Sequence, residues 1–539
     1  MVQNERGGVM GIYINPGYNG FEEIRRDIYV DKTGLIAYVN SLIGKPKPLV
    51  SFSRPRRFGK SFDANMLCAY YDRSCDSRFL FEDLEISRDP DFEKHLNQYN
   101  VISFDVTGFI ADAKEKGTNI VFEIKNSVLK ELRELFPDCI DTEESNLGKA
   151  LYAVVSRGNA KFVFVIDEWD ALFREFKNDR QLHKDYILFL RNLFKNKDLT
   201  GKTIAAAYMT GILPIKKYGT ESALSDFREF SMTDPLILSK YVGFTEAEVR
   251  MLCDRYDTDF EEMKQWYDGY SFEDMSSVYS PNSVMSAINF RRFKSYWTQT
   301  ETFEGLKNYI GMDFDGLKGA ITEMLGGGRV SVKISSFQND MTSFQNKNDV
   351  LTLLIHLGYL AYDSEKREAY IPNLEVAEAY EDAVNNEKWG IVGEAVADSE
   401  KLLDATLRKD ADAVAEALEM THESVSSVLQ YNNESSLSCA ITIAYYTAKR
   451  FYRIVRELPS GKGYADLAFI PRRGTDKPAM IVELKYDKDA DSAIRQIHDN
   501  RYDGVLKEYV GNLLLVGINY DKEARGEDAK KHSCIIEQA

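Results

Sequence analysis

The sequence is poor in the features that mark secreted, membrane-spanning or zinc-binding proteins. Its six cysteines lie far apart and form no CxxC pair, so neither a disulfide framework nor a zinc site is indicated. The six histidines are equally scattered, which gives little support to catalysis by a histidine cluster. No run approaches the roughly twenty apolar residues of a membrane span, and the first residues lack the apolar core of a secretory signal. We therefore expect a protein of a reducing cytoplasm without a membrane partner.

Net positive charge is also absent. The formal charge of −17 at pH 7 argues against non-specific coating of nucleic acid, because neutralisation of phosphates drives such binding. Basic clusters remain at residues 54–57 and 291–294, although charge runs of this kind are more often solvated faces. The 539 residues, of which 44% are hydrophobic, suffice for two to four domains with ordinary cores.

Residues 48–65, PLVSFSRPRRFGKSFDAN, have the order strand, basic loop, helix. Between strand and helix, Gly59, Lys60 and Ser61 supply the glycine, lysine and hydroxyl with which a phosphate-binding loop holds phosphate oxygens and Mg²⁺. The general pattern also has a glycine where this chain has Arg54. Nucleotide binding and a basic surface turn before a helix are both compatible with this stretch alone.

A second strand ends in two acids. In KFVFVIDEWDAL, residues 161–172, an apolar run precedes Asp167 and Glu168, as expected of a buried parallel strand whose carboxyl end faces a ligand. Asp167 can hold Mg²⁺ through water, and Glu168 can polarise the attacking water of a phosphoryl transfer. Together with the basic loop, these acids favour nucleotide binding over a core strand that ends in solvated carboxylates.

Strands and helices alternate through the first 210 residues, which predicts βαβ units and a parallel sheet. Thr210 ends the last of these strands, where it can sense a γ-phosphate or simply terminate the strand. The expected strands are 48–52, 101–106, 161–166 and 202–209, and the expected helices are 62–72, 120–136 and 182–194.

The middle of the chain is helical and aromatic. Aromatic clusters such as WYDGYSF, residues 266–272, usually mean core packing or an interdomain seam. Residues 351–362, followed by 370–373, predict a helix and a β-hairpin, as in a winged-helix module, although many such units bind nothing. Residues 375–430 are helical and acidic, consistent with a connecting region.

The last hundred residues carry a second group of charged side chains. A helix is expected at 434–452 and strands at 452–457, 463–470, 479–485 and 512–519. Glu483 and Lys485 share one face of an apolar strand, because side chains at i and i+2 point the same way. Burying such a pair is costly unless the groups are paired or hold a metal.

Asp466 lies mid-strand, and the polar, turn-like segment 471–477 predicts a hairpin that brings it near Glu483. The two carboxylates can then bind Mg²⁺, with the Leu484 carbonyl as a third ligand, while Lys485 orients or deprotonates the hydrolytic water. A surface strand with an ordinary salt bridge is the alternative.

Several of these segments resemble one known architecture. FEEIRRDIYVDKTGLI, FSRPRRFGKS, FVFVIDEWDAL and WYDGYSF are similar to the bacterial AAA-ATPase-like family whose members carry a C-terminal domain of the PD-(D/E)XK nuclease superfamily. In that family RPRRFGK[ST] replaces the glycine-led loop, so Arg54 and Pro55 match it. The segments YNNESSLSCAITIAYY, KGYADLAFIPRR and PAMIVELKYDKDADSAIRQI follow the superfamily order of helical Glu, strand Asp, strand Glu-x-Lys and helical Gln.

The resemblance implies one set of site residues, and the phosphate-binding loop and strand ends described above supply a second. The catalytic set of the nuclease-like region is Glu434, Asp466, Glu483, Lys485 and Gln496, with Tyr502 as a further candidate. The nucleotide-binding set is Arg57, Gly59, Lys60, Ser61, Asp167 and Thr210, with Glu168 as its catalytic residue. The metal ligands are Ser61 and Asp167 at the first site, and Asp466, Glu483 and Leu484 at the second.

We therefore predict an α/β protein with a P-loop NTPase parallel sheet, a helical middle region with a winged-helix candidate, and a C-terminal restriction-endonuclease-like α/β domain. The expected boundaries are 12–230 for the ATPase-like domain, 231–375 for the helical lid and winged-helix region, 376–430 for a helical connector and 431–539 for the nuclease-like domain. The expected cofactors are ATP and Mg²⁺.

The expected function is ATP binding and hydrolysis with a Mg²⁺-dependent nucleic-acid phosphodiesterase. The alternative is a non-catalytic, NTP-dependent switch or scaffold whose terminal domain only binds nucleic acid or a partner. The acidic net charge favours the scaffold, whereas intact Asp466, Glu483 and Lys485 favour the enzyme. DNA against RNA as the nucleic-acid partner, the activity of either site and homo-oligomerisation stay open.

Overall fold

The computed structural model describes the chain except residues 1, 4–8, 197, 216–223, 273–274, 298–301, 313, 340, 386–388, 430–433, 461–462, 473–474, 500–505, 507–508, 510, 523 and 525–529. Its contacts divide the chain into two compact units. The first unit comprises Met1–Met263, Tyr267–Phe293 and Val332–Arg367. The second comprises Lys264–Trp266, Lys294–Ser331 and Glu368–Ala539.

A five-stranded, all-parallel sheet organises the first unit. The strands lie in the order β4 (Asn100–Asp105), β5 (Phe162–Asp167), β6 (Ile204–Gly211), β3 (Leu49–Ser53), β7 (Arg228–Phe230). Because the strands are parallel, their carboxyl ends meet at one edge, where Asp105 lies opposite Asp167 and Ser53 lies opposite Gly211. The predicted parallel sheet is confirmed, although β6 begins at Ile204 because a short helix, α10 (Thr200–Thr203), precedes it.

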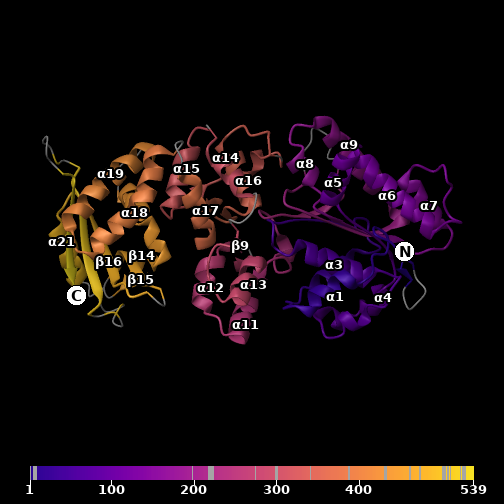
Figure 1. Cartoon of the computed structure of the whole chain (residues 1–539), viewed down its shortest axis with the longest axis horizontal. Helices are drawn as coiled ribbons and strands as arrows, with labels where there is room; N and C mark the ends of the chain where they lie inside the picture. Colours follow the sequence, from indigo (N-terminus) through magenta and orange to yellow (C-terminus); the bar gives the residue numbers. More distant parts are fainter. Residues whose placement is uncertain are drawn as a thin grey trace. The chain divides into compact units, whose positions relative to one another are not determined.

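Helices cover both faces of this sheet (Figure 1). Alternate residues of β5, namely Phe162, Phe164 and Ile166, join the helices of one face in a single apolar core. The helices of that face are α5 (Val106–Lys116), α6 (Ile120–Leu135), α7 (Leu147–Ser156), α8 (Ala171–Glu175) and α9 (Arg180–Phe194). Those of the other face are α1 (Asn19–Arg26), α2 (Gly34–Leu42), α3 (Lys60–Tyr71) and α4 (Phe92–His95), with 3₁₀ turns at Arg78–Leu80 and Glu85–Arg88.

Side-chain caps fix where several of these helices begin. Asn119 accepts from the amides of Val121 and Phe122 at the start of α6, where the sequence pattern also placed it. Asp179 accepts from the amide of Leu182, so α9 begins two residues before its apolar pattern does.

The rest of the first unit is built around a small antiparallel sheet. Its strands are β8 (Phe244–Thr245), β10 (Met275–Tyr279) and β9 (Tyr270–Phe272). Tyr267, Tyr270 and Phe272 of the WYDGYSF segment are buried, as both core packing and an interdomain seam predict for these aromatic rings. The helices are α11 (Glu246–Tyr256), which begins with a Thr245–Glu248 capping box, α12 (Phe260–Tyr267), α13 (Pro281–Phe290) and α16 (Lys347–Leu357), with 3₁₀ turns at Leu236–Leu238 and Ile334–Ser336.

Two short strands, β12 (Ala361–Asp363) and β13 (Glu368–Tyr370), follow α16 in the chain. The winged-helix interpretation of this stretch and the four domain boundaries stay predictions. Two further strand pairs are short, β1 (Val2–Gln3) with β2 (Val9–Met10) and β11 (Val330–Ser331) with β13.

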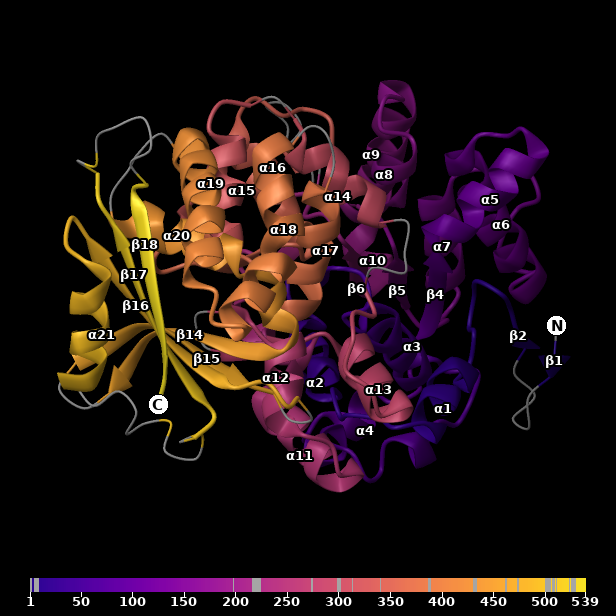
Figure 2. The ribbon, with the colours of Figure 1, turned by 60° about the vertical axis from the view of Figure 1, so that its left-hand side comes forward.

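The second unit contains a mixed five-stranded sheet in the order β14 (Tyr452–Ser460), β15 (Gly463–Pro471), β16 (Ala479–Tyr486), β17 (Leu513–Tyr520), β18 (His532–Gln538). Only β16 and β17 are parallel, and α21 (Ala490–Asp499) connects them as such a pair requires. The first four strands confirm the predicted ones, whereas the sequence pattern did not reveal β18. Figure 2 shows the sheet with α21 on one face.

Helices on the other face of this sheet form its main core with the strands. The helices of the unit are α14 (Thr302–Ile310), α15 (Leu317–Leu325), α17 (Leu374–Val384), α18 (Gly390–Leu407), α19 (Ala411–Leu429) and α20 (Glu434–Ala444). The expected helix from 434 to 452 is therefore too long, because α20 ends at Ala444 and a 3₁₀ segment, Tyr446–Arg450, follows. Across both units, none of the described helices combines the length and apolarity needed to cross a membrane.

Candidate functional site

The loop between β3 and α3 has the backbone of a phosphate-binding turn. Gly59 precedes α3 with φ 95°, a left-handed conformation that favours glycine. A Cβ added to Gly59 would meet nothing within 4 Å, so the space beside it is open. Lys60 and Ser61 then begin a twelve-residue helix whose positive end faces the loop.

Lys60 is buried at the centre of this site. Its Nζ donates to the Pro55 carbonyl at 2.9 Å and lies 3.9 Å from Oε1 of Glu168. Burial lowers the pKa of Lys60, and the charge of Glu168 opposes that shift. The loop therefore holds the lysine ammonium group beside the end of β5.

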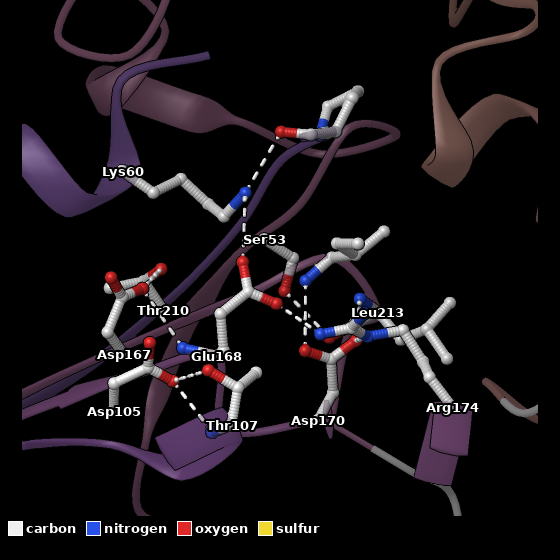
Figure 3. Close-up of polar contacts among 12 residues, drawn as sticks. Ser53, Lys60, Asp105, Thr107, Asp167, Glu168, Asp170, Arg174, Thr210 and Leu213 are labelled. Carbon is white, nitrogen blue, oxygen red and sulfur yellow. Dashed lines mark hydrogen bonds and ion pairs between the residues drawn. The ribbon is translucent and has the colours of Figure 1, made fainter. Parts of the chain in front are cut away.

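The carboxyl ends of β5 and β6 bring three of the expected residues together. Oδ1 of Asp167 accepts from Oγ1 of Thr210 at 2.9 Å and from the amide of Glu168 at 2.9 Å (Figure 3). Glu168 has φ 51°, a left-handed conformation that a side chain rarely adopts. Burial raises the pKa of Glu168, while Lys60 and then Arg174 act in the opposite direction.

Sequence reasoning missed two charged residues of this site, Asp170 and Arg174. Arg174 pairs through NH2 with Oε2 of Glu168, and its Nε lies 3.1 Å from Oδ2 of Asp170. Their i and i+4 spacing just after Asp167-Glu168 was the available signal, because residues four apart on a helix are neighbours.

A pocket of about 820 Å³ opens beside the loop, within the first unit. Its lining includes the loop residues Arg57, Gly59, Lys60 and Ser61, and also Glu168 and Arg174. The rest of the lining is mixed. It includes apolar side chains, Ile24, Ile28, Tyr29, Val30, Phe62, Met66, Tyr241, Phe244 and Met285, and charged ones, Glu23, Asp27, Lys32, Arg56, Asp63 and Glu175. Apolar walls with a few polar groups are typical of small-molecule sites.

Asp63 is a buried acid in the wall of this pocket. It lines the pocket from α3 and is buried, yet its Oδ2 has no hydrogen-bond partner among the described residues. Burial raises the pKa of Asp63 well above its usual range. The Ser61 hydroxyl and the Asp167 carboxylate are the oxygen donors that Mg²⁺ prefers, so the residues present fit a metal–nucleotide ligand.

Arg54 occupies the position where the general loop pattern has glycine. Its side chain is 0% exposed, with the guanidinium 4.5 Å from the Phe52 ring centre and 4.9 Å from that of Phe272. NH1 donates to the Ser53 carbonyl, and burial lowers the pKa to about 9. Arg54 therefore supports the loop from within the protein, and the substitution leaves the ligand side of the loop open.

The second group of charges lies on β15 and β16. Leu467 pairs with Val482 in an antiparallel register, so the preceding Asp466 lies beside the following Glu483. Oδ2 of Asp466 accepts from the Leu484 amide at 2.7 Å. The hairpin that the sequence predicted is confirmed, and it brings the two carboxylates together.

Lys485 joins Glu483 to α21. Its Nζ lies 2.9 Å from Oε1 of Glu483 and 2.6 Å from Oε1 of Gln496. The structure thus brings together four residues of the expected set. Loss of Asp466 would not leave Lys485 unpaired, because Glu483 and Gln496 both contact its ammonium group.

Glu483 is the residue of this group that fits a cation. It is 2% exposed, and its Oε2 has no hydrogen-bond partner among the described residues. Burial raises the pKa of Glu483 to about 7, with a further contribution from the charge of Asp466. No cluster of three or more His, Cys, Asp or Glu side chains is arranged for a metal in the described part of the chain, so these two carboxylates would need further ligands.

Two expected residues cannot be placed. Glu434 begins α20, but its side chain lies outside the described residues, and so does the whole of Tyr502. Leu484 has its side chain in the core of the sheet, and its amide donates to Asp466 as described above.

Residues 16–220 match the family model described as predicted AAA-ATPase, and residues 433–529 match that of the PD-(D/E)XK nuclease superfamily. No curated protein matches the chain. The Walker-type ATPase of Pyrococcus abyssi is similar at 14% identity and a TM-score of 0.34, over 66% of this chain and 96% of that one.

The two family matches cover the two groups of charged residues described above, each within its own unit. The chain therefore has one region similar to the predicted AAA-ATPase family and another similar to the PD-(D/E)XK nuclease superfamily, which matches the architecture that the sequence resembled.

Proposed function

We propose that the first unit binds and hydrolyses ATP, and that the C-terminal sheet is a Mg²⁺-dependent phosphodiesterase acting on nucleic acid. The observation that carries the proposal is that both sites place a lysine beside a carboxylate. At the first site Lys60 lies 3.9 Å from Glu168, and at the second Lys485 lies 2.9 Å from Glu483. Phosphoryl transfer needs this combination of positive charge, metal ligands and a group that handles water.

At the nucleotide site, Lys60 would exchange the Pro55 carbonyl for the outer phosphates of ATP, a stronger, charge-assisted contact. Ser61 and Asp167 would hold Mg²⁺, which neutralises phosphate charge when bound. Glu168 would orient or deprotonate the attacking water, and Thr210, bonded to Asp167, would sense the γ-phosphate. Arg57 lines the mouth of the pocket, where it would meet the phosphates.

At the nuclease-like site, Asp466 and the unpartnered oxygen of Glu483 would hold Mg²⁺, which offsets charge on the scissile phosphate. The Leu484 carbonyl and Glu434 remain proposed contributors to this site. Lys485 would orient the hydrolytic water or stabilise the negative charge that develops on the phosphate. The side-chain oxygen of Gln496 would hold the Lys485 ammonium group in place.

The test of the first half is ATP hydrolysis by the full chain with Mg²⁺. Glu168→Gln should bind ATP as tightly as wild type and hydrolyse it at least about a hundredfold more slowly, because general-base assistance contributes about 10²–10⁴-fold. Hydrolysis by Glu168→Gln at the wild-type rate would remove Glu168 from the mechanism.

The test of the second half is cleavage of a mixed panel of single-stranded and duplex DNA and RNA. Each substrate is incubated with Mg²⁺ or EDTA, with and without ATP. Cleavage with Mg²⁺ alone, or with Mg²⁺ and ATP, supports a nuclease. A protein that hydrolyses ATP but cuts nothing on the panel would instead be an NTP-dependent switch or scaffold.

A further inference from the structure

A network of buried charges joins the end of β5 to the loop after β6, and Arg174 lies at its centre. Arg174 belongs to α8 and is 7% exposed as a side chain. One of its nitrogens contacts Oε2 of Glu168, and another contacts Oδ2 of Asp170 (Figure 3). The guanidinium therefore bridges two carboxylates that follow the same strand.

The Asp170 side of the bridge is anchored to backbone. Its Oδ1 accepts from the Ile212 amide at 3.2 Å, and its Oδ2 accepts from the Leu213 amide at 2.9 Å. A Cβ added to Gly211 would lie 2.6 Å from Oδ1 of Asp170, so the approach requires glycine there. Asp170 is fully buried and both of its oxygens have partners. Asp170 thereby fixes the position of Arg174.

The Glu168 side of the bridge is the one that the proposed reaction changes. In the free protein Glu168 lies between two cations, with Arg174 on Oε2 and Lys60 3.9 Å from Oε1. A bound phosphate would compete for Lys60, because the charge-assisted contact to phosphate is the stronger one. Arg174 has its second contact to the anchored Asp170, so it would stay and become the cation that still directs Glu168.

We propose that Arg174 is the positioning residue for Glu168: bridged to Asp170, it holds the Glu168 carboxylate in its working orientation when Lys60 turns to the nucleotide. This inference rests on the proposed ATP hydrolysis by Glu168. Arg174 acts through Glu168 and contributes to the chemical step, whereas ATP binding depends on the loop and the pocket walls.

A burial argument supports the assignment. A buried ion pair costs desolvation energy and is often no more stabilising than apolar side chains of similar size, so retaining this one calls for another reason. Asp170 would be satisfied by its two backbone amides without Arg174. The additional contact that Arg174 makes is the one to Glu168. Misorientation of the group that orients or deprotonates the attacking water slows the chemical step steeply.

The test is a double-mutant cycle between Arg174→Gln and Glu168→Gln, with kcat and KM for ATP, the Kd for ATP without Mg²⁺ and the melting temperature measured on each variant. Alone, Arg174→Gln should lower kcat at least about tenfold, with KM and Kd changed less than about twofold. In the Glu168→Gln background it should have no further effect on kcat, because the group through which it acts is gone. Arg180→Gln, which removes an exposed arginine at the start of α9, is the matched control and should match wild type.

Other outcomes overturn the inference. A wild-type kcat for Arg174→Gln would show that Glu168 needs no positioning. An equal loss of kcat in both backgrounds would show that Arg174 contacts the nucleotide itself or only stabilises the fold. If Arg174→Gln does not fold, the cycle is run with Arg174→Lys, which keeps the charge but cannot bridge two carboxylates and should lower kcat only when Glu168 is present.

Failure of this inference is distinct from failure of the proposed function. If Glu168→Gln slows hydrolysis and Arg174→Gln does not, the ATPase proposal stands and the role of Arg174 is wrong. A wild type without ATP hydrolysis, or an unimpaired Glu168→Gln, would contradict the proposed function and this inference together.

Discussion

Replacing Asp466 with asparagine should abolish cleavage and leave the metal-free protein at least as stable as wild type. Asp466 and Glu483 are neighbouring carboxylates on β15 and β16, and like charges placed across a strand pair destabilise it by up to about 1 kcal/mol. Asparagine removes that repulsion but keeps an oxygen that can accept from the Leu484 amide, now bonded to Asp466 at 2.7 Å. The free energy of unfolding should therefore stay level or rise by about 1 kcal/mol.

Alanine at the same position should behave differently. Asp466→Ala removes the repulsion too, but it leaves the Leu484 amide without its acceptor, which costs about 1–3 kcal/mol if that amide stays buried. Lys485 is not stranded in either variant, because Glu483 and Gln496 hold it. Asp466→Asn should therefore melt above Asp466→Ala by several degrees, at about 2–4 °C per kcal/mol for a unit of this size.

The assay is scanning calorimetry of the full chain in EDTA, paired with a cleavage assay in Mg²⁺ on the same preparations. Asp491→Asn, an exposed acid in the first turn of α21, is the control and should change neither quantity. The reasoning would be refuted if Asp466→Asn melted as low as Asp466→Ala, since the aspartate would then be needed for the fold as a charge.

Two further predictions concern other groups. Lys60→Ala should weaken ATP binding in calorimetry more than about tenfold, or about 1.4 kcal/mol, whereas the exposed Lys45→Ala should bind normally; equal affinities for Lys60→Ala and wild type would contradict the loop assignment. Burial, together with the charges of His532 and Lys531, lowers the pKa of His422 to about 4, and the charge of Glu419 acts in the opposite direction. Between about pH 6.5 and 4 the unfolded state therefore binds a proton at His422 that the folded state does not. The free energy of unfolding of the second unit should therefore fall by on the order of 3 kcal/mol as pH falls through that window. Hydrogen exchange of β17 and β18 measures this pH dependence. His422→Asn should flatten it, whereas His498→Asn should not.

The parallel sheet of the first unit was predictable mainly from β5, whose residues 162–166 are an unbroken apolar run, whereas the three-residue strand β7, Arg-Glu-Phe, was not predicted. A strand buried on both faces, such as β5, has no polar alternation, and its length and flanking acids identified it. The order of the strands was not predictable. β3 lies between β6 and β7. This pairing joins segments more than 150 residues apart in the chain, and local hydrophobic periodicity cannot predict it.

Errors in the second unit have local causes. The apolar pattern continues beyond Ala444 because Tyr445, Tyr446 and Ala448 are buried, so it could not show where α-helical hydrogen bonding ends. The strand β18 has only a short apolar run in a polar context, and it gains its place by pairing with β17.

The two candidate sites differed in how visible they were in the sequence. Lys60, Asp167 and Glu168 belong to motifs whose spacing reflects direct chemistry with phosphates. Asp170 and Arg174 are proposed to act through their contact with Glu168, so no motif spacing connects them to the loop. The role proposed for them rests on the structure, in which the backbone amides of residues 212 and 213 donate to Asp170.

The central claim is that the carboxylates of β15 and β16 cut nucleic acid with a metal. Its most direct test is the rate of Mg²⁺-dependent cleavage by wild type, Asp466→Asn and Glu483→Gln on the best substrate of the panel, with EDTA as the blank. We expect cleavage by wild type only, with both variants still folded and still hydrolysing ATP. Undiminished cleavage by either folded variant, or no cleavage by wild type on any substrate with or without ATP, would contradict metal-dependent cleavage by Asp466 and Glu483.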